Sequence, residues 1–370
     1  MKKWFKVFDV FVASVMMLSA VTACSSSSQS ASSGSSATTS ASAASSGTAA
    51  ESTSAGKGPY KIGWSTIYLT PSWMQQTKAM MDKRISYWKT KGVVSDYTIA
   101  NANGDTSTQI SQIENMIAQG YKAILLDAGS STALNAVVEK AAAQGVVIVN
   151  FDSLVTTDKV SSTIDTSQTD YGKQCAEWLA KKIGGKGKII LFSGPAGVAV
   201  SVDRQKGAEE VLKQYPDIKV VSTVNSEYNE SPALQAIQPV LDSNPDVAGI
   251  LSLGGTLSSA SLKAVEQKGM KFIPITGENY NAFMKEWAKD KPQGFSSYAV
   301  GQPNWLGVLA IDQSIRILNG EKYTKNVIVP LPVYTDDNLS QFVPNNFADD
   351  GYPIADITED QIQQYLGAAK

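Results

Sequence analysis

The sequence predicts an α/β protein with two similar doubly wound lobes, each built on a parallel sheet with helices on both faces. Strand and helix signals alternate from about Tyr60 to Val329, and this alternation is typical of parallel sheets. Several strands are short apolar runs without polar alternation, as expected for strands buried on both faces. The strands are too many for one five- or six-stranded sheet, which predicts two lobes.

In the first half of the globular region, apolar runs alternate with helical periodicity, and capping residues mark several helix ends. Asp105 to Ser107 supplies a helix N-cap, and Gly120 and Gly145 stop helices. The predicted strands are 60–67, 94–100, 122–127 and 146–152. The predicted helices follow Pro71, follow the cap at 105–107, and span 132–144.

After Thr163 the same pattern restarts. The predicted strands are 188–194, 218–224, 247–253, 271–278 and 295–300, with a last strand at 327–329. The predicted helices are 170–183, 204–215, 232–241, 258–268, 282–289 and 303–318.

The start of the chain has the features of a bacterial lipoprotein signal. Three lysines within the first six residues precede an apolar stretch at 10–21 that is short for a membrane span. The stretch ends in Val21-Thr22-Ala23-Cys24, which matches a lipobox, so we expect cleavage before Cys24 and a lipid on its thiol. An ordinary signal peptide with a chance cysteine is the alternative, but small residues precede Cys24. Residues 24–58 are rich in Ser and Ala and predict a flexible tether.

This arrangement predicts a folded module anchored by lipid at the outer face of the cytoplasmic membrane. A net charge of −2 and 18% charged residues give no indication of a nucleic-acid partner. The chain has no histidine, which excludes Ser-His-Asp and Cys-His catalysis and most zinc sites. Cys175 has no disulfide partner once Cys24 is assigned to the signal, and its helical spacing with Trp178 predicts a small buried hydrophobe. No metal or cofactor is predicted.

Carboxylates end several of the apolar strands. Asp152 ends the run that begins at Gly145, Asp127 ends the strand before it, and Glu278 ends the corresponding strand of the second lobe. Ligands of open α/β sheets bind beyond the carboxyl ends of strands. From position alone, two roles for Asp152 are equally supported: capping the next turn and contacting a ligand. Its counterpart Glu278 favours ligand contact, with the two carboxylates facing each other across a cleft.

Five motifs, in this order and spacing, resemble the ribose/galactose family of periplasmic sugar-binding proteins over about residues 60–329. They are Trp64-Ser-Thr-Ile with Pro71-Ser72-Trp73, the strand 147–152, Gly194-Pro-Ala-Gly197 with Arg204 and Gly207, Asn244-Pro-Asp-Val, and Thr276-Gly-Glu-Asn279. The resemblance implies the periplasmic binding protein type 1 fold, two Rossmann-like lobes joined by three crossovers that act as a hinge. We place the lobes at 59–165 plus 302–333 and at 166–301 plus 334–370.

The resemblance also implies a set of ligand-binding residues. They are the aromatics Trp73 and Tyr228, the carboxylates Asp152 and Glu278, and the polar Ser65, Ser72, Ser153, Asn279 and Gln302. Asp127 ends the third strand as Asp152 ends the fourth, so we add it as a secondary contact. Three positions depart from the family pattern. Ser153 and Val202 replace arginines, and Gly254-Gly255 replaces an Asn-Asp pair, so the resemblance does not identify the ligand as ribose.

The expected function is that of a monomeric substrate-binding lipoprotein, not an enzyme, that captures a small sugar or polyol for an ABC permease. One alternative is a receptor that presents its ligand to a membrane sensor kinase. Another is a glycosidase that uses Asp152 and Glu278 as its acid/base pair, which would require a raised pKa on one of them.

Overall fold

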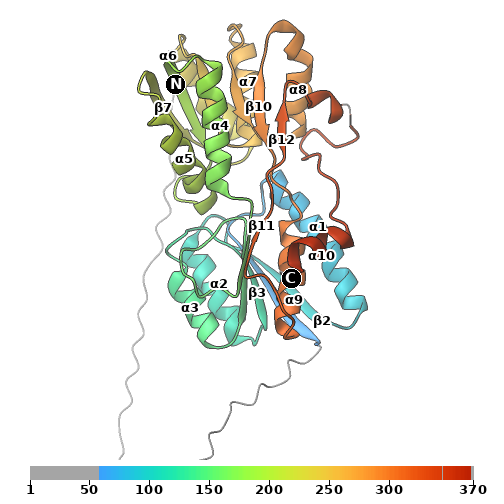
Figure 1. Ribbon diagram of the computed structural model, residues 1–370. Helices are drawn as coiled ribbons and strands as arrows, with labels where there is room; N and C mark the ends of the chain where they lie inside the picture. Colours follow the sequence, from blue (N-terminus) through green and yellow to red (C-terminus); the bar gives the residue numbers. More distant parts are fainter. Residues whose placement is uncertain (1–57, 344, 368–370) are drawn as a thin grey trace, which may run out of the picture. The chain divides into compact units, whose positions relative to one another are not determined.

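The structure is a computed structural model, and it describes residues 58–343 and 345–367 (Figure 1). The predicted signal peptide, Cys24 and nearly all of the predicted tether lie outside these residues. Among the helices that are described, none has both the length and the apolar character needed to cross a membrane.

Within the described residues the strands form two six-stranded sheets, which confirms the predicted fold class. The first sheet has the order β11-β5-β4-β3-β1-β2, and its neighbouring strands are all parallel. Its strands are β1 (Tyr60–Thr66), β2 (Val94–Asn101), β3 (Ala123–Asp127), β4 (Val147–Phe151), β5 (Ser162–Asp165) and β11 (Asn326–Ile328).

The second sheet has the corresponding order β12-β10-β9-β8-β6-β7. It is parallel except at its edge, where β12 runs antiparallel to β10. Its strands are β6 (Gly187–Ser193), β7 (Ile218–Asn225), β8 (Gly249–Ser252), β9 (Ile275–Gly277), β10 (Ser297–Val300) and β12 (Val333–Thr335).

Helices cover both faces of each sheet because alternate strand residues point to opposite sides. In β3, Leu125 packs with α1 and α9, while Ile124 and Leu126 pack with α2 and α3. In β6, Ile190 belongs to the cluster on one face and Leu191 to the cluster on the other. The helices are α1 (Ser72–Thr90), α2 (Thr106–Ala118), α3 (Asn135–Ala143), α4 (Gln168–Lys182), α5 (Ala199–Leu212), α6 (Glu230–Ser243), α7 (Gly255–Gln267), α8 (Asn281–Asp290), α9 (Leu306–Leu318) and α10 (Glu359–Leu366), with 3₁₀ turns η1 (Lys291–Gln293) and η2 (Leu339–Gln341).

Up to β12, the part of the chain that the structure describes passes between the two lobes at three points. It leaves the first sheet after β5 to form α4, returns after β10 to form α9, and leaves again between β11 and β12. These passages are the three crossovers that the resemblance implied. Their ends bring Gln168 and Gln302 close to the carboxyl ends of the strands.

Several elements differ from the sequence prediction. Helix α5 begins at Ala199, five residues before Arg204, and β9 is limited to Ile275–Gly277 because Pro274 precedes it without an amide hydrogen to donate. Strands β5 and β12 and helix α10 were not predicted. Helix α10 lies in the range assigned to the second lobe, yet it packs against α9 of the first lobe.

Helices α4 and α5 pack closely because glycines lie where they cross. A methyl group on Gly172 would lie 1.8 Å from the Arg204 carbonyl oxygen, and one on Gly207 would lie 1.9 Å from the Thr169 carbonyl oxygen. Both obstacles are backbone atoms, which cannot move aside as a flexible side chain would. The glycines therefore fix the position of α5, which carries Arg204, relative to α4.

We expect Gly207→Ala to destabilise the protein, because the added methyl group must push α5 away from α4. Overpacking of a tight core costs about 1–3 kcal/mol, and contact with backbone places this change near the upper end. Thermal unfolding of the purified variant measures the effect. The exposed neighbour Lys206→Ala is the matched control, and a melting temperature for Gly207→Ala equal to that of the control would contradict the proposed packing constraint.

Candidate ligand-binding site

A cavity lies between the carboxyl ends of the strands of the two sheets. The space among its side chains, part of it open to solvent, is about 590 Å³. It is lined by Ile67, Tyr68, Pro71, Trp73, Met74, Asp127, Asp152, Pro195, Val198, Val200, Arg204, Tyr228, Glu278, Gln302 and Tyr352. Both lobes therefore supply its wall.

Two carboxylates from neighbouring strands form the polar part of the first-lobe wall. Asp127 ends β3 and accepts a hydrogen bond of 2.7 Å from the Thr66 hydroxyl. Asp152 follows β4 with a φ of 60°, in the left-handed region that Asp adopts more readily than most residues. This backbone turn separates the directions of Asp152 and Ser153. Asp152 lines the cavity, while the Ser153 hydroxyl donates to the Ala128 carbonyl oxygen at 2.5 Å.

Burial raises the pKa of these carboxyl groups. The pKa of Asp127 is raised to about 7, mainly by desolvation and in spite of the hydrogen bonds from Thr66 and Ile67. The pKa of Asp152 is raised well above its ordinary value by desolvation and by the nearby charge of Asp127, although Arg204 opposes the shift. The first-lobe wall is thus a pair of buried acids that accept hydrogen bonds readily and resist carrying two full negative charges.

Arg204 is the only cation among the residues that line the cavity, and it is 3% exposed. Its Nε donates to Gln168 Oε1 at 2.8 Å and its Nη1 to the Leu253 carbonyl oxygen at 2.9 Å. The guanidinium carbon lies 3.9 Å from the centre of the Tyr171 ring, a cation–π contact. These contacts fix the planar group along its edges and on one face.

Two glutamines connect Arg204 to Asp152. Gln168 donates from Nε2 to Asp152 Oδ1 at 3.2 Å while its Oε1 accepts from Arg204. Gln302 does the same, donating from Nε2 to Asp152 Oδ1 and accepting from Arg204 Nη2 at its Oε1. Both glutamines lie in crossover segments, so each amide joins a carboxylate of the first lobe to an arginine of the second.

Glu278 closes this network from the second lobe. Its Oε2 accepts from the Gly255 amide at the N-terminus of α7, at 3.3 Å, and lies 3.5 Å from Arg204 Nη1. The N-terminus of a helix favours a negative charge. Burial raises the pKa of Glu278, and Arg204 and the Gly255 amide act in the opposite direction.

Two aromatic residues, one from each lobe, lie at the cavity wall. Trp73 donates from Nε1 to the Gln302 carbonyl oxygen at 3.1 Å. Tyr228 occupies a space that two glycines leave open, because a methyl group would lie 2.2 Å from its ring at Gly194 and 2.7 Å at Gly254. The Tyr228 and Ser201 hydroxyls are 3.1 Å apart. This packing explains why glycine stands at position 254, where the family pattern has a polar residue.

The structure brings six of the ten predicted ligand-binding residues to the cavity wall, namely Trp73, Asp127, Asp152, Tyr228, Glu278 and Gln302. The other four are Ser65, Ser72, Ser153 and Asn279, which do not line it. Ser65 is fully buried and accepts from Gln109 Nε2 at 3.3 Å. Ser72 is the first residue of α1, and Asn279 is buried with its Oδ1 close to Gly301. Ser153 is held by Ala128, as described above.

Sequence analysis did not include Arg204, Gln168 and Tyr352 in the site. Arg204 was noted only as part of a motif, and the arginine of the family pattern aligned instead with Val202, which is 45% exposed. Two further residues named in the sequence analysis lie in the core. Trp64 is fully buried and packs near Phe151, with ring centres 6.3 Å apart, and Cys175 is buried as predicted.

One group of acidic residues outside the cavity has the spacing of a metal site. Glu266, Glu286 and Asp290 lie close together near the start of η1. However, Lys289 Nζ already pairs with all three carboxylates, at 3.4 Å from Glu266 and 3.7 Å from Asp290. The ammonium group supplies the positive charge that a metal ion would bring, so this group is an ion-pair cluster.

Two lobes with a cavity at the switch points of their parallel sheets define a two-lobed ligand-binding protein. The chain belongs to the family described as the periplasmic binding protein domain, whose profile matches residues 62–322.

Among curated relatives, the chain is 25% identical over 287 residues to the ribose import binding protein of Bacillus subtilis, covering 78% of this chain and 91% of the relative. It is 27% identical over 291 residues to the xylitol-binding protein of Mycolicibacterium smegmatis, covering 78% of this chain and 81% of the relative.

Solved structures share the fold. An ABC transporter solute-binding protein from Thermobispora bispora superposes with a TM-score of 0.74 at 22% identity, covering 82% of this chain and 94% of that one. The binding protein of the arabinose ABC transporter from Shewanella gives a TM-score of 0.67 at 21% identity, covering 76% and 93%.

The raised pKa of Asp127 predicts a specific pH dependence of stability. From its ordinary value of 3.8 up to about 7, the folded protein keeps a proton that the unfolded chain has released, so the free energy of unfolding falls as the pH rises through this window. One pKa unit corresponds to about 1.4 kcal/mol. We therefore expect Asp127→Asn, which stays neutral, to be more stable than the wild type at pH 8 by up to roughly 4 kcal/mol.

Thermal unfolding from pH 4 to pH 8 measures this effect. The wild type and the exposed control Asp337→Asn should lose stability as the pH rises, and Asp127→Asn should lose less. Parallel curves for all three proteins would show that Asp127 titrates at its ordinary pKa.

Proposed function

We propose that this protein is the substrate-binding component of an ABC importer and that it captures a small sugar or polyol between its two lobes. The observation that carries the proposal is the hydrogen-bond network of Asp152, Gln302 and Arg204, which joins the two lobes at the wall of a cavity that Trp73 and Tyr228 also line. The curated relatives named above are import or binding proteins for ribose and xylitol. We propose the same class of ligand for this chain.

The chemistry of the cavity suits a polyhydroxylated ligand. A sugar hydroxyl both donates and accepts, so it pairs with a carboxylate on one side and with a guanidinium or an amide on the other. Asp152, Arg204 and Gln302 offer these groups within one network. The C–H faces of a sugar ring pack against aromatic rings, and Trp73 and Tyr228 supply such faces from opposite lobes. A ligand that contacts both lobes stabilises the arrangement in which they approach each other.

The glycosidase alternative has less support. A carboxylate pair that works as acid and base requires environments that push the two pKa values apart. Burial raises the pKa of both Asp152 and Glu278. Each carboxylate also accepts hydrogen bonds from protein groups, Asp152 from two glutamines and Glu278 from Gly255. Hydrogen-bonded recognition of hydroxyls is the function that this arrangement favours.

The proposed function is tested by titrating the purified protein with pentoses, hexoses and polyols in a calorimeter. We expect at least one of them to bind, and we expect Asp152→Asn to weaken that binding at least tenfold, because an amide cannot replace a carboxylate that accepts two donors. Asparagine is preferred to alanine here because it tolerates the positive φ at this position.

Asp337→Asn is the matched control and should bind like the wild type. No binding across the panel by the wild-type protein would contradict the proposed function. Unchanged affinity in a folded Asp152→Asn variant would contradict the role of Asp152 alone.

We further propose that a lipid on Cys24 anchors the protein outside the cytoplasmic membrane, where it delivers ligand to a permease. In cells of a bacterial host fed a labelled fatty acid, the wild type should carry the label and remain with the membrane fraction. Cys24→Ala should lose both, because the thiol that accepts the lipid is gone. Cys175→Ala is the control, and label retained by Cys24→Ala would disprove the anchor.

Delivery to a permease and presentation to a membrane sensor kinase use the same cavity, and the partner distinguishes them. We expect the ligand-bound protein to stimulate ATP hydrolysis by a reconstituted permease and its ATPase. Stimulation of a sensor kinase in place of the permease would favour the receptor function instead.

A further inference from the structure

The segment 345–358, which we call the C-terminal strap, connects the two lobes outside the three crossovers. It begins on the second lobe, at the N-terminus of α8. The Asn281 amide donates to the Gly351 carbonyl oxygen at 2.9 Å and the Ala282 amide to that of Asp349 at 2.9 Å. The Asn281 side chain also donates to the Phe347 and Ala348 carbonyl oxygens, at 2.8 and 3.0 Å.

From Tyr352 onward, the strap contacts the first lobe. Gln76 on α1 pairs with the backbone of Tyr352 in both directions. Its Nε2 donates to the Tyr352 carbonyl oxygen at 2.9 Å, and its Oε1 accepts from the Tyr352 amide at 3.0 Å. Lys83 pairs with Asp356 at 2.6 Å, and Arg84 pairs with Glu359 at the start of α10. The strap therefore changes lobes between Gly351 and Tyr352.

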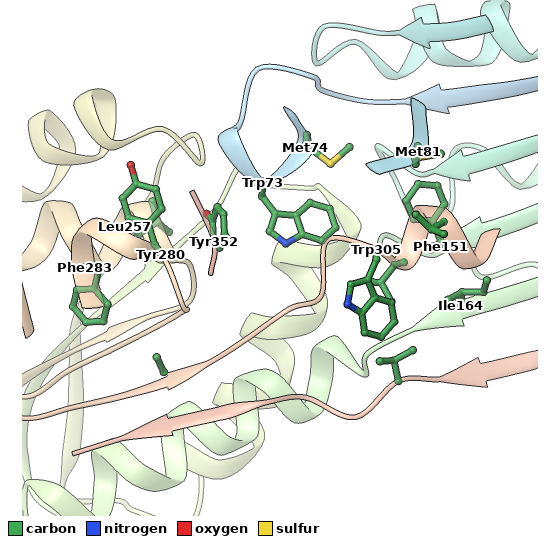
Figure 2. Close-up of a cluster of buried hydrophobic side chains, with 14 of the residues drawn as sticks. Trp73, Met74, Met81, Phe151, Ile164, Leu257, Tyr280, Phe283, Trp305 and Tyr352 are labelled. Carbon is green, nitrogen blue, oxygen red and sulfur yellow. The ribbon is translucent and has the colours of Figure 1, made fainter. Parts of the chain in front are cut away.

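Tyr352 lies at this change of lobes, and its side chain lines the cavity. It is 3% exposed. Its ring packs against Tyr280 with ring centres 5.5 Å apart, and a methyl group on Gly255 would lie 3.2 Å from the ring. Figure 2 shows Tyr352 in line with Tyr280 and Trp73. The backbone of Tyr352 is thus fixed to the first lobe while its ring packs on the second.

We propose that Tyr352 is a specificity-determining residue of this binding site and that the strap holds it in position. The inference rests on the proposed function, since it assigns a third aromatic contact to the same ligand. The ring offers a face for the C–H groups of a sugar in a cavity that Trp73 and Glu278 also line. The hydroxyl, which interacts with the Ser72 side chain, can donate one hydrogen bond and accept others. Tyr352 lies beyond residues 62–322, the part that the family profile matches.

Tyr352 also links the two lobes to each other. Because Gln76 holds its backbone on the first lobe while Tyr280 and Gly255 contact its ring from the second, any separation of the lobes must break one of these two sets of contacts. A ligand that touches the ring adds to the contacts that keep both sets intact. Gln76 is therefore a positioning residue that acts through Tyr352.

Calorimetric titration of the same sugar and polyol panel tests this proposal. Tyr352→Phe removes only the hydroxyl and should weaken binding about five- to tenfold, with a changed rank order among ligands that differ at one hydroxyl, since one hydrogen bond is worth about that factor. Tyr352→Ala should weaken binding further. Tyr323→Phe, at an exposed tyrosine, is the matched control and should bind like the wild type.

A double-mutant cycle tests the positioning role of Gln76. Gln76→Ala should weaken binding in the wild-type background and have little further effect in Tyr352→Ala, because it acts through the ring that is missing there. The exposed neighbour Gln75→Ala should have little effect in either background. Melting temperatures of all variants identify any that fail to fold, and Tyr352→Phe keeps the proposal testable if Tyr352→Ala is one of them.

The outcomes separate this proposal from the proposed function. If the wild type binds none of the sugars and polyols, both fail. If the wild type and Tyr323→Phe bind while folded Tyr352→Phe and Tyr352→Ala keep the same affinities and rank order, only the assignment of Tyr352 is overturned. Additive effects of Gln76→Ala and Tyr352→Ala would overturn the positioning role of Gln76.

Discussion

The buried guanidinium of Arg204 is the constraint on which the arrangement of the site depends. A charge buried to this extent is stable only when acceptors surround it, and this one has Gln168, Gln302, Glu278 and the Leu253 carbonyl oxygen. Those acceptors come from two crossovers and two strand ends, so all four must be positioned together. The glycines at the α4–α5 crossing allow the two helices to pack closely, and this packing fixes the position of Arg204 on α5. Fold and site are therefore linked through one side chain.

The same network connects ligand chemistry to the hinge. Gln168 and Gln302 each join Asp152 to Arg204, and each lies where the chain passes between lobes. When a ligand hydroxyl takes the place of a glutamine amide at Asp152, Arg204 loses the oxygen of that amide as an acceptor. The ligand must then supply a new acceptor to Arg204, because leaving Asp152 or Arg204 unpaired in a buried site costs about 1–3 kcal/mol. A ligand able to satisfy both groups at once is favoured over one that satisfies only one.

Several of the predicted residues that line the cavity owe their position to a short local pattern. Asp127, Asp152 and Glu278 end apolar strands, and the ends of parallel strands meet at one edge of a sheet. Ser153 also follows a strand, but the positive φ of Asp152 turns it toward Ala128, and no local pattern indicates such a turn. Tyr352 depends on a contact with Gln76, 276 residues away. The sequence around Tyr352 has no periodicity that would indicate its place, so only the folded chain reveals it.

The charges that surround the cavity bear on the kind of ligand that fits. Three carboxyl groups, Asp127, Asp152 and Glu278, face it, and Arg204 is the single cation among the lining residues, already paired with Glu278. Burial has raised the pKa of all three acids, which means that additional negative charge is unfavourable there. An anionic ligand would add such charge without a free cation to meet it. A neutral polyhydroxylated ligand instead donates hydrogen bonds to the carboxylates, which favours their ionised forms. The electrostatics of the cavity and its hydrogen-bonding groups therefore select the same class of ligand.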